Sequence, residues 1–286
     1  MIHYLSAGVK RAFGLHRPGR ELQIFPNDTF LVSYPKSGNT WARMLIANLL
    51  SSGKPADFWT INHLVPELEG ATKRDLARMS RPRIIKSHFA FDPRYPRVIY
   101  IVRDPRDVVI SEYHYQRKTR QIDDQFSIAE YVLRFIAGRT CPNDGSWGQN
   151  VSSWIVTRGN DASFLLIRYE TLLSDTVAQL TRIADFLNIA ATPERLAEVA
   201  NLSSVDRMRK LEATQSQASS LMKNGRRDVA FVRAAKSGSW KTELDESLVH
   251  KIEAAWGPLM RHLGYDSHFA DGSGSPGVAD LVLSKR

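Results

Sequence analysis

The eight residues from Tyr34 to Trp41, Tyr-Pro-Lys-Ser-Gly-Asn-Thr-Trp, have the types and spacing that bind a phosphate group. Lys36 supplies a mobile positive charge, and Gly38 lets the backbone approach a ligand closely. Backbone N–H groups in such a turn, together with the positive end of a following helix dipole, attract an anion. The segment therefore predicts a ligand of the nucleotide type.

Two predicted elements hold this turn. Residues 29–34 form an apolar, β-rich run typical of a buried strand, and apolar side chains recur at helical spacing in residues 40–50. The usual phosphate loop of ATP and GTP enzymes places its lysine after the second glycine, whereas here the lysine comes first. Taken alone, the segment is also compatible with a tight strand-to-helix turn and a solvated lysine.

A second apolar run, residues 97–102, is followed by Arg103 and, eight residues later, by Ser111. Pro105 suits the first turn of a helix, so this pattern indicates a strand that leads directly into a helix. A guanidinium at the end of the strand and a hydroxyl two turns along the helix could close on one phosphate. The alternative is a surface arginine and an unrelated helix serine.

A third run, residues 83–88, is a short strand pattern that ends in Lys86-Ser-His88. Histidine is the side chain best suited to accept a proton near neutral pH. A lone histidine after a strand is more often an ordinary packed or surface group, and the chain contains 8 histidines. Only its sequence context distinguishes His88.

In this order, the segments resemble those of sulfotransferases that use 3′-phosphoadenosine 5′-phosphosulfate (PAPS) as donor. The resemblance extends over residues 34–241 and implies a P-loop-like nucleotide-binding topology. It implies that the loop holds the 5′ side of the donor, that Arg103 and Ser111 bind its 3′-phosphate, and that Tyr169 reaches the adenine. The implied loop ligands are Lys36, Ser37, Gly38, Asn39 and Thr40, and Trp41 is expected on one face of the adenine.

Two later segments also match, with departures. Residues 201–208 resemble the family segment that covers the other face of the adenine, which implicates Ser204 and Val205, although many members carry an aromatic residue at the second position. Residues 231–241 resemble the element that wraps the 3′-phosphate, which implicates Arg233 and Gly238. Alanines replace the lysine and glycine that normally follow Arg233, so Lys236 is a candidate substitute for the missing charge.

By the same resemblance, the chain is a PAPS-dependent enzyme that sulfates a hydroxyl of a small molecule and releases adenosine 3′,5′-bisphosphate (PAP). His88 is the expected general base, with Lys36 and Lys86 as electrostatic stabilisers and no metal. Candidate walls of the acceptor pocket are residues 56–63, the stretch from Tyr113 to Tyr115, Trp147 and the polar loop of residues 213–227. Phe58 and Trp59 would suit an apolar acceptor and are equally compatible with a helix core.

Element spacing predicts an α/β fold with one domain over residues 1–270, and we expect a mobile tail over residues 271–286, which is rich in Gly and Ser up to residue 276. Apolar strands near residues 29, 83, 97 and 163 alternate with helical stretches near 40, 105, 128, 148, 175 and 247. This alternation favours a central parallel sheet with helices on both faces. Ligands of such sheets bind beyond the carboxyl ends of the strands, where the motifs fall.

The net charge of +9 and the single cysteine limit the remaining function classes. Clustered lysine and arginine would indicate nucleic-acid binding, but the charge is spread along the chain, and a polyanionic donor explains a positive cleft. One cysteine, Cys141, suits a reducing compartment, and the sequence has neither a run of 18 apolar residues nor a secretory leader pattern, so we expect a cytoplasmic protein. A P-loop kinase and a non-catalytic nucleotide- or nucleic-acid-binding protein remain the alternatives.

Overall fold

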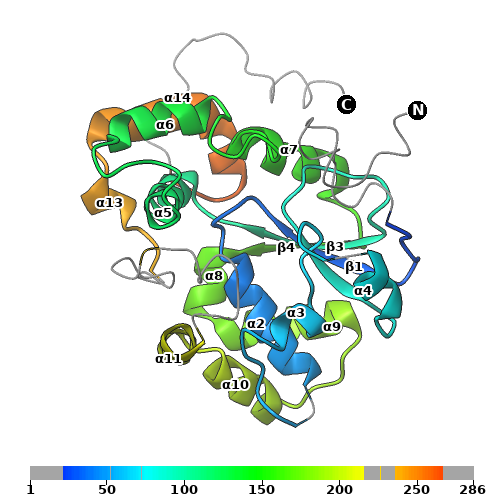
Figure 1. Ribbon diagram of the computed structural model, residues 1–286. Coiled ribbons are helices and arrows are strands. Elements are labelled where there is room, and N and C mark those ends of the chain that lie inside the picture. Colours follow the sequence, from blue (N-terminus) through cyan, green and yellow to red (C-terminus); the bar gives the residue numbers. More distant parts are fainter. Residues whose placement is uncertain (1–21, 52, 72, 216–225, 227–235, 267–286) are drawn as a thin grey trace, which may run out of the picture.

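The computed structural model describes residues 22–51, 53–71, 73–215, 226 and 236–266. In this part of the chain, four parallel strands form one sheet with helices on both faces (Figure 1). The strands are β1 (Thr29–Ser33), β2 (Ile84–Ser87), β3 (Arg97–Val102) and β4 (Phe164–Arg168). The expected tail, residues 271–286, and the N-terminal 21 residues lie outside the described residues.

The strand order is β2-β1-β3-β4, so the chain moves from β1 to one neighbour and then crosses to the other side of β1. In the parallel register, Val32 lies opposite both Ser87 of β2 and Tyr100 of β3. The carboxyl ends of β1, β2 and β3 therefore meet at one edge. Open α/β sheets bind their ligands at such a switch point.

Alternate residues of each strand face opposite layers of helices. Phe30 and Val32 join a core with the helices α5, α6, α7 and α14, whereas Leu31 joins a core with α2, α9 and α10. The period of two follows from the pleat of a strand, and the continuous apolar character follows from burial on both faces. This is why the strand runs in the sequence are largely apolar.

The helices fall on the two sides of the sheet that Figure 1 shows, with α2, α9, α10 and α11 below it and α5, α6, α7 and α14 above it. The longer helices are α2 (Asn39–Leu50), α5 (Pro105–Lys118), α6 (Ile128–Ile136), α7 (Trp147–Arg158), α9 (Thr176–Leu187), α10 (Pro193–Leu202), α11 (Val205–Thr214) and α14 (Glu246–His262). The shorter ones are α3 (Ile61–Leu64), α4 (Lys73–Arg78), α8 (Tyr169–Ser174) and α13 (Trp240–Glu243).

The predicted α/β class, the parallel sheet and all four strand positions are confirmed. Local chemistry explains the helix starts: Asp104 caps α5 through the N–H of Arg106, and Ser146 forms a capping box at α7. β4 ends at Arg168, and Tyr169 opens α8.

Candidate functional site

The predicted phosphate loop is a tight turn between β1 and α2. Lys36 and Gly38 both adopt the left-handed backbone conformation, with φ of 66° and 95°. A Cβ on Gly38 would lie 2.4 Å from a ring carbon of Tyr169, so only glycine fits here without displacing that ring. Gly38 is also the N-cap of α2 and offers no side chain to the first N–H groups of the helix, which leaves that end suited to an anion.

Two buried donors beside this turn have no acceptor among the described residues. They are the Ser37 hydroxyl, whose residue is 0% exposed, and the Nε of Arg103, whose residue is 7% exposed. Buried polar atoms are normally hydrogen-bonded, so each such donor in a native fold needs an explanation. A ligand that brings phosphate oxygens would satisfy both, and the donor set therefore fits a nucleotide.

The side-chain ammonium group of Lys36 lies against α5, the helix that carries Tyr115. Its Nζ lies 4.1 Å from the centre of the Tyr115 ring. Burial lowers the pKa of Lys36 to about 8, while the buried carboxylate of Glu112 opposes this shift and Arg103 adds to it. The lysine is thus still positive at neutral pH, and a bound phosphate would strengthen its hold on the proton.

Arg103 connects two segments that are distant in the sequence. Its Nη1 donates to the Lys36 carbonyl oxygen at 3.3 Å, and its Nη2 donates to the Lys236 carbonyl oxygen at 3.0 Å. Its guanidinium carbon also lies 4.4 Å from the centre of the Tyr169 ring. The predicted partner Ser111 lies two turns along α5, half-buried, with no hydrogen bond to Arg103.

The C-terminal part of the predicted 3′-phosphate site is described only from residue 236. Gly238 has a φ of 80°, and its N–H donates to Asp107 at 2.7 Å. Lys236 is exposed and contributes its backbone carbonyl to Arg103, so its role as a substitute cation stays a prediction. Arg233 lies outside the described residues.

The residues predicted for the adenine come together from three parts of the chain. The Trp41 indole Nε1 donates to the Ser203 carbonyl oxygen at 2.9 Å, and its ring meets Tyr169 edge-on with centres 5.9 Å apart. Ser204 and Val205 follow at the start of α11. These contacts place Trp41, Tyr169 and the junction between α10 and α11 on one side of the phosphate loop.

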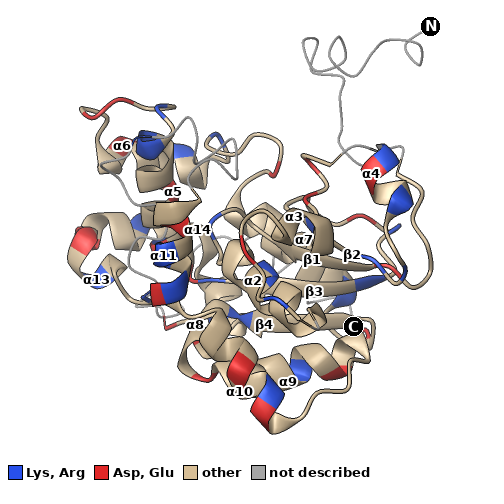
Figure 2. Cartoon of the chain, turned by 60° about the horizontal axis from the view of Figure 1, so that its bottom comes forward, with Lys and Arg blue, Asp and Glu red and all other residues tan. Residues whose placement is uncertain are grey.

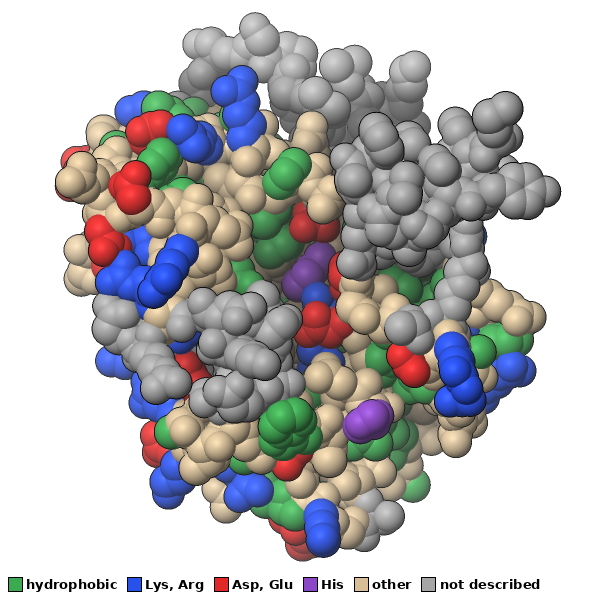
Figure 3. Space-filling model, viewed as in Figure 1, with side chains coloured by type: hydrophobic (Ala, Val, Ile, Leu, Met, Phe, Trp, Pro, Cys, Tyr) green, Lys and Arg blue, Asp and Glu red, His purple; other side chains and the backbone are tan. Residues whose placement is uncertain are grey.

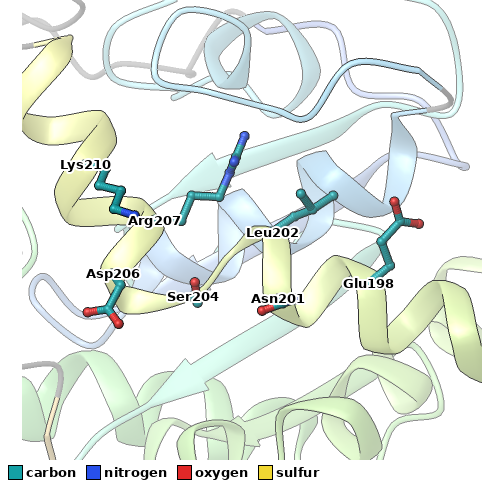
Figure 4. A pocket seen from close by; sticks show the side chains of 7 residues that line it. All are labelled: Glu198, Asn201, Leu202, Ser204, Asp206, Arg207 and Lys210. Atoms are coloured by element: carbon teal, nitrogen blue, oxygen red, sulfur yellow. The ribbon is translucent and has the colours of Figure 1, made fainter.

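A pocket of about 300 Å³ opens at that junction (Figure 4). Ser204 lines it, and the close-up shows Leu202 of α10 and Arg207 of α11 projecting to the same side while Asp206 turns away. The other lining residues are Glu198, Asn201 and Lys210. Ser204 is the predicted ligand found in this pocket.

His88 follows β2 directly, and hydrogen bonds of its backbone and of its ring hold it in place. Its Nδ1 lies 2.7 Å from the Ser33 carbonyl oxygen, to which it must donate, so the neutral ring keeps its lone pair on Nε2. Its own N–H donates to Glu69 at 2.8 Å, and its carbonyl oxygen accepts from Asn150 at 2.9 Å. This tautomer is the one a general base requires.

The surroundings of His88 keep it neutral. Burial, and after it the positive charge of Lys86, lowers the pKa of His88 to about 4. Lys86 is 6% exposed, and its Nζ lies 3.4 Å from a carboxylate oxygen of Glu69 and 3.7 Å from one of Glu67. Lys86 and His88 are therefore adjacent, as predicted, one charged and one able to accept a proton.

Sequence reasoning missed several residues of this site. Ser33 links the loop to His88, because its hydroxyl accepts from Asn39 at 3.0 Å while its carbonyl oxygen accepts from the His88 ring. Asp144 is another: burial and then repulsion by Glu69 raise its pKa to about 7. Figure 3 shows a hollow in the middle of one face, where a histidine lies among acidic and basic side chains.

Two of the candidate acceptor-wall residues, Trp147 and Phe58, are buried. Trp147 is fully buried, and its Nε1 donates to the Arg103 carbonyl oxygen at 3.2 Å, so it supports Arg103 from the core. Phe58 is also a core residue, at 4% exposed, whereas its neighbour Trp59 is 52% exposed. Tyr115 does lie at the site, against Lys36.

Within the described residues, no helix is both long and apolar enough to cross a lipid bilayer, and no cluster of His, Cys, Asp and Glu has a metal-binding arrangement. Residues 26–264 match the sequence model of a protein family that is described as the sulfotransferase domain.

Human sulfotransferase 2B1 is 30% identical over 249 residues, which cover 82% of this chain and 66% of the relative's length. A rat relative, sulfotransferase 2A1, is 31% identical and is matched over 84% of its length. Mouse sulfotransferase SULT7A1, solved in complex with PAP, superimposes with a TM-score of 0.67 at 25% identity, covering 84% of this chain and 86% of that one. The chain therefore belongs to the PAPS-dependent sulfotransferase family of enzymes.

Proposed function

We propose that this protein transfers the sulfuryl group of PAPS to a hydroxyl of a small molecule, with His88 as general base. The observation that carries the proposal is the junction of β1 and β2, where the Ser33 carbonyl oxygen accepts the Nδ1 proton of His88 one residue before the phosphate loop begins. A base with its Nε2 lone pair available thus stands next to an anion-binding turn.

The nucleotide would be held at both ends. Lys36, Ser37, Gly38, Asn39 and Thr40 would bind its 5′ side, and Arg103, Ser111, Arg233, Lys236 and Gly238 are the proposed ligands of its 3′-phosphate. Trp41, Tyr169, Ser204 and Val205 would contact the adenine. The Ser37 hydroxyl and the Arg103 Nε have no hydrogen-bond acceptor among the described residues. Ser37 would donate to the 5′ side of the nucleotide and Arg103 to its 3′-phosphate.

PAPS supplies the activated sulfuryl group, and the protein has to align it and stabilise charge. In-line group transfer of this kind depends on positioning and on fixed positive charge at the oxygens where negative charge grows. Lys36 carries such a charge at the loop, and Lys86 carries one beside the base. His88 takes the proton of the acceptor hydroxyl on Nε2, which increases the nucleophilicity of the oxygen.

The two alternative functions fit less well. A kinase needs an acid for Mg²⁺ after a strand, and the candidate, Asp104, already accepts from Arg106 through both carboxylate oxygens, at 2.9 and 2.6 Å. A nucleic-acid-binding protein needs a basic stripe, but Figure 2 shows basic and acidic residues scattered over several elements. The single cysteine supports the cytoplasm as the proposed location.

The test is transfer of radiolabelled sulfate from PAPS to a pool of small hydroxyl compounds. The wild-type protein should label at least one acceptor, and His88→Ala should reduce the rate by a factor on the order of 100 or more while PAP still binds. His250→Ala, an exposed site on α14, is the matched control and should keep the wild-type rate. Wild-type-like rates in His88→Ala would refute the assigned base, and tighter binding of ATP or an oligonucleotide than of PAP would favour the alternatives.

A further inference from the structure

Asp107 lies outside the predicted site but accepts hydrogen bonds from three successive residues near the C-terminus. The Gly238 N–H donates to its Oδ2 at 2.7 Å, and both the Ser239 hydroxyl and the Trp240 N–H donate to its Oδ1 at 3.1 Å. The residue is 1% exposed. A buried carboxylate that accepts three hydrogen bonds fixes the segment that donates them.

The same carboxylate faces Arg103, four residues earlier in the chain. Oδ2 of Asp107 lies 3.9 Å from Nη2 of Arg103, and this nitrogen donates to the Lys236 carbonyl oxygen at 3.0 Å. Asp107 and Arg103 together therefore hold both ends of the short segment 236–240. Because Arg103 also donates to the Lys36 carbonyl oxygen, the segment is tied to the phosphate loop.

The shape of this segment depends on the anchor. Gly238 has a φ of 80°, and a Cβ there would meet nothing within 4 Å, so the turn is not held by packing around that residue. Ser239 is the N-cap residue of α13, but its side chain makes no capping hydrogen bond. The N–H of Trp240, the first residue of α13, donates to Asp107 instead. Without the carboxylate, the N–H groups of Gly238 and Trp240 and the Ser239 hydroxyl would lose their acceptor.

We propose that Asp107 is a positioning residue for the 3′-phosphate end of the nucleotide site. This inference rests on the proposed function, because it assumes that Arg103 binds that phosphate beside the segment 236–240. Asp107 does not touch the nucleotide: it holds residues 238–240 and orients the Arg103 guanidinium. It should therefore set how strongly the protein prefers a nucleotide with a 3′-phosphate over one without it.

The test compares the affinities of the intact protein for PAP and for adenosine 5′-monophosphate, which lacks the 3′-phosphate. Asp107→Asn keeps the size of the side chain but turns one acceptor into a donor that faces N–H groups. Hydrogen bonds to charged groups are strong enough that the Kd of PAP should rise by a factor on the order of ten. The Kd of the monophosphate should change by less than about twofold, since the 5′ loop has its own ligands.

Two further variants separate positioning from general stability. Asp28→Asn removes another buried carboxylate, the partner of Arg83 at the far end of the sheet, and should lower the melting temperature without changing the ratio of the two affinities. Ser239→Ala removes one donor to Asp107 and leaves the carboxylate in place; it should weaken PAP binding about threefold with no effect on the monophosphate.

If Asp107→Asn folds and the ratio of the two Kd values, for PAP and for the monophosphate, stays at its wild-type value, the inference is overturned. Equal weakening of both ligands is one form of this outcome. If Asp107→Asn does not fold, an unchanged ratio in Ser239→Ala overturns it. A wild-type protein that binds both nucleotides equally would instead refute the proposed 3′-phosphate site, so the two failures are distinguishable.

Discussion

Lowering the pH should slow the reaction only when His88 itself takes up a proton, and this should occur far below the ordinary pKa of histidine. Burial and the charge of Lys86 lower the pKa of His88 from 6.5 to about 4. A shift of about 2.5 pH units favours the neutral imidazole by roughly 3 kcal/mol. The base is therefore competent over the whole range in which an ordinary histidine becomes protonated.

The expected effect is largest near pH 5.5. There, roughly 97% of a group with a pKa of about 4 is neutral, against roughly 9% of a group with the ordinary value of 6.5. The kcat/KM for the acceptor should thus be nearly the same at pH 5.5 and pH 7, whereas an unperturbed histidine would lose about tenfold.

The assay is the initial rate of labelled sulfate transfer at limiting acceptor from pH 4 to pH 8. The acceptor should be an aliphatic alcohol, since its hydroxyl does not titrate in this range. Asp144, with a pKa of about 7, is the neighbouring group that could add its own pH dependence, so Asp144→Asn is the control. An acidic limb with its midpoint near pH 6.5 that persists in Asp144→Asn would refute the reasoning.

The lowered pKa of His88 also makes the free energy of unfolding depend on pH. The unfolded chain binds the proton of His88 near pH 6.5 and the folded chain only near pH 4. The contribution of this group to the free energy of unfolding is therefore complete above pH 6.5 and is lost progressively as the pH falls toward 4.

Two further predictions concern the phosphate loop. Gly38→Ala should weaken PAP binding at least tenfold, because the new Cβ would lie 2.4 Å from the Tyr169 ring at a φ of 95°, whereas Gly53→Ala, with nothing within 4 Å, should bind normally in the same calorimetric titration. Equal affinities of the two variants would contradict the close approach. Since Lys36 loses its proton as the pH rises through about 8, the affinity for PAP should fall by up to about fivefold between pH 8 and pH 9. Lys36→Met should bind weakly at every pH without this dependence, and a wild-type affinity that stays constant up to pH 9 would show that the pKa of Lys36 is not lowered.

The sequence predicted the parts of the site that depend on short-range patterns. The four strands are largely apolar because both faces of the sheet are covered, and the loop from Tyr34 to Trp41 carries its chemistry within eight residues. His88 is the expected base only through the resemblance of Lys86-Ser-His88 to the family motif. The geometry confirms that these residues meet at the carboxyl ends of β1 and β2.

The parts that were missed depend on long-range contacts or on burial. Asp107 meets Gly238 across 131 residues, and nothing near Asp107 in the sequence indicates such a partner. Its spacing of four from Arg103 places both on one face of a helix start, which is a weak signal that could have been used. Trp147 was expected in the acceptor wall, but an aromatic residue at a helix N-terminus can equally be buried, and here it is.

The most direct test of the account is a crystal structure of the protein with PAP. We expect the 5′-phosphate on the N–H groups and side chains of residues 36–40 and the 3′-phosphate on Arg103 and the segment from residue 236 to residue 238, with Nε2 of His88 facing the 5′ side. A nucleotide bound in the reverse orientation, or away from this edge of the sheet, would contradict the account.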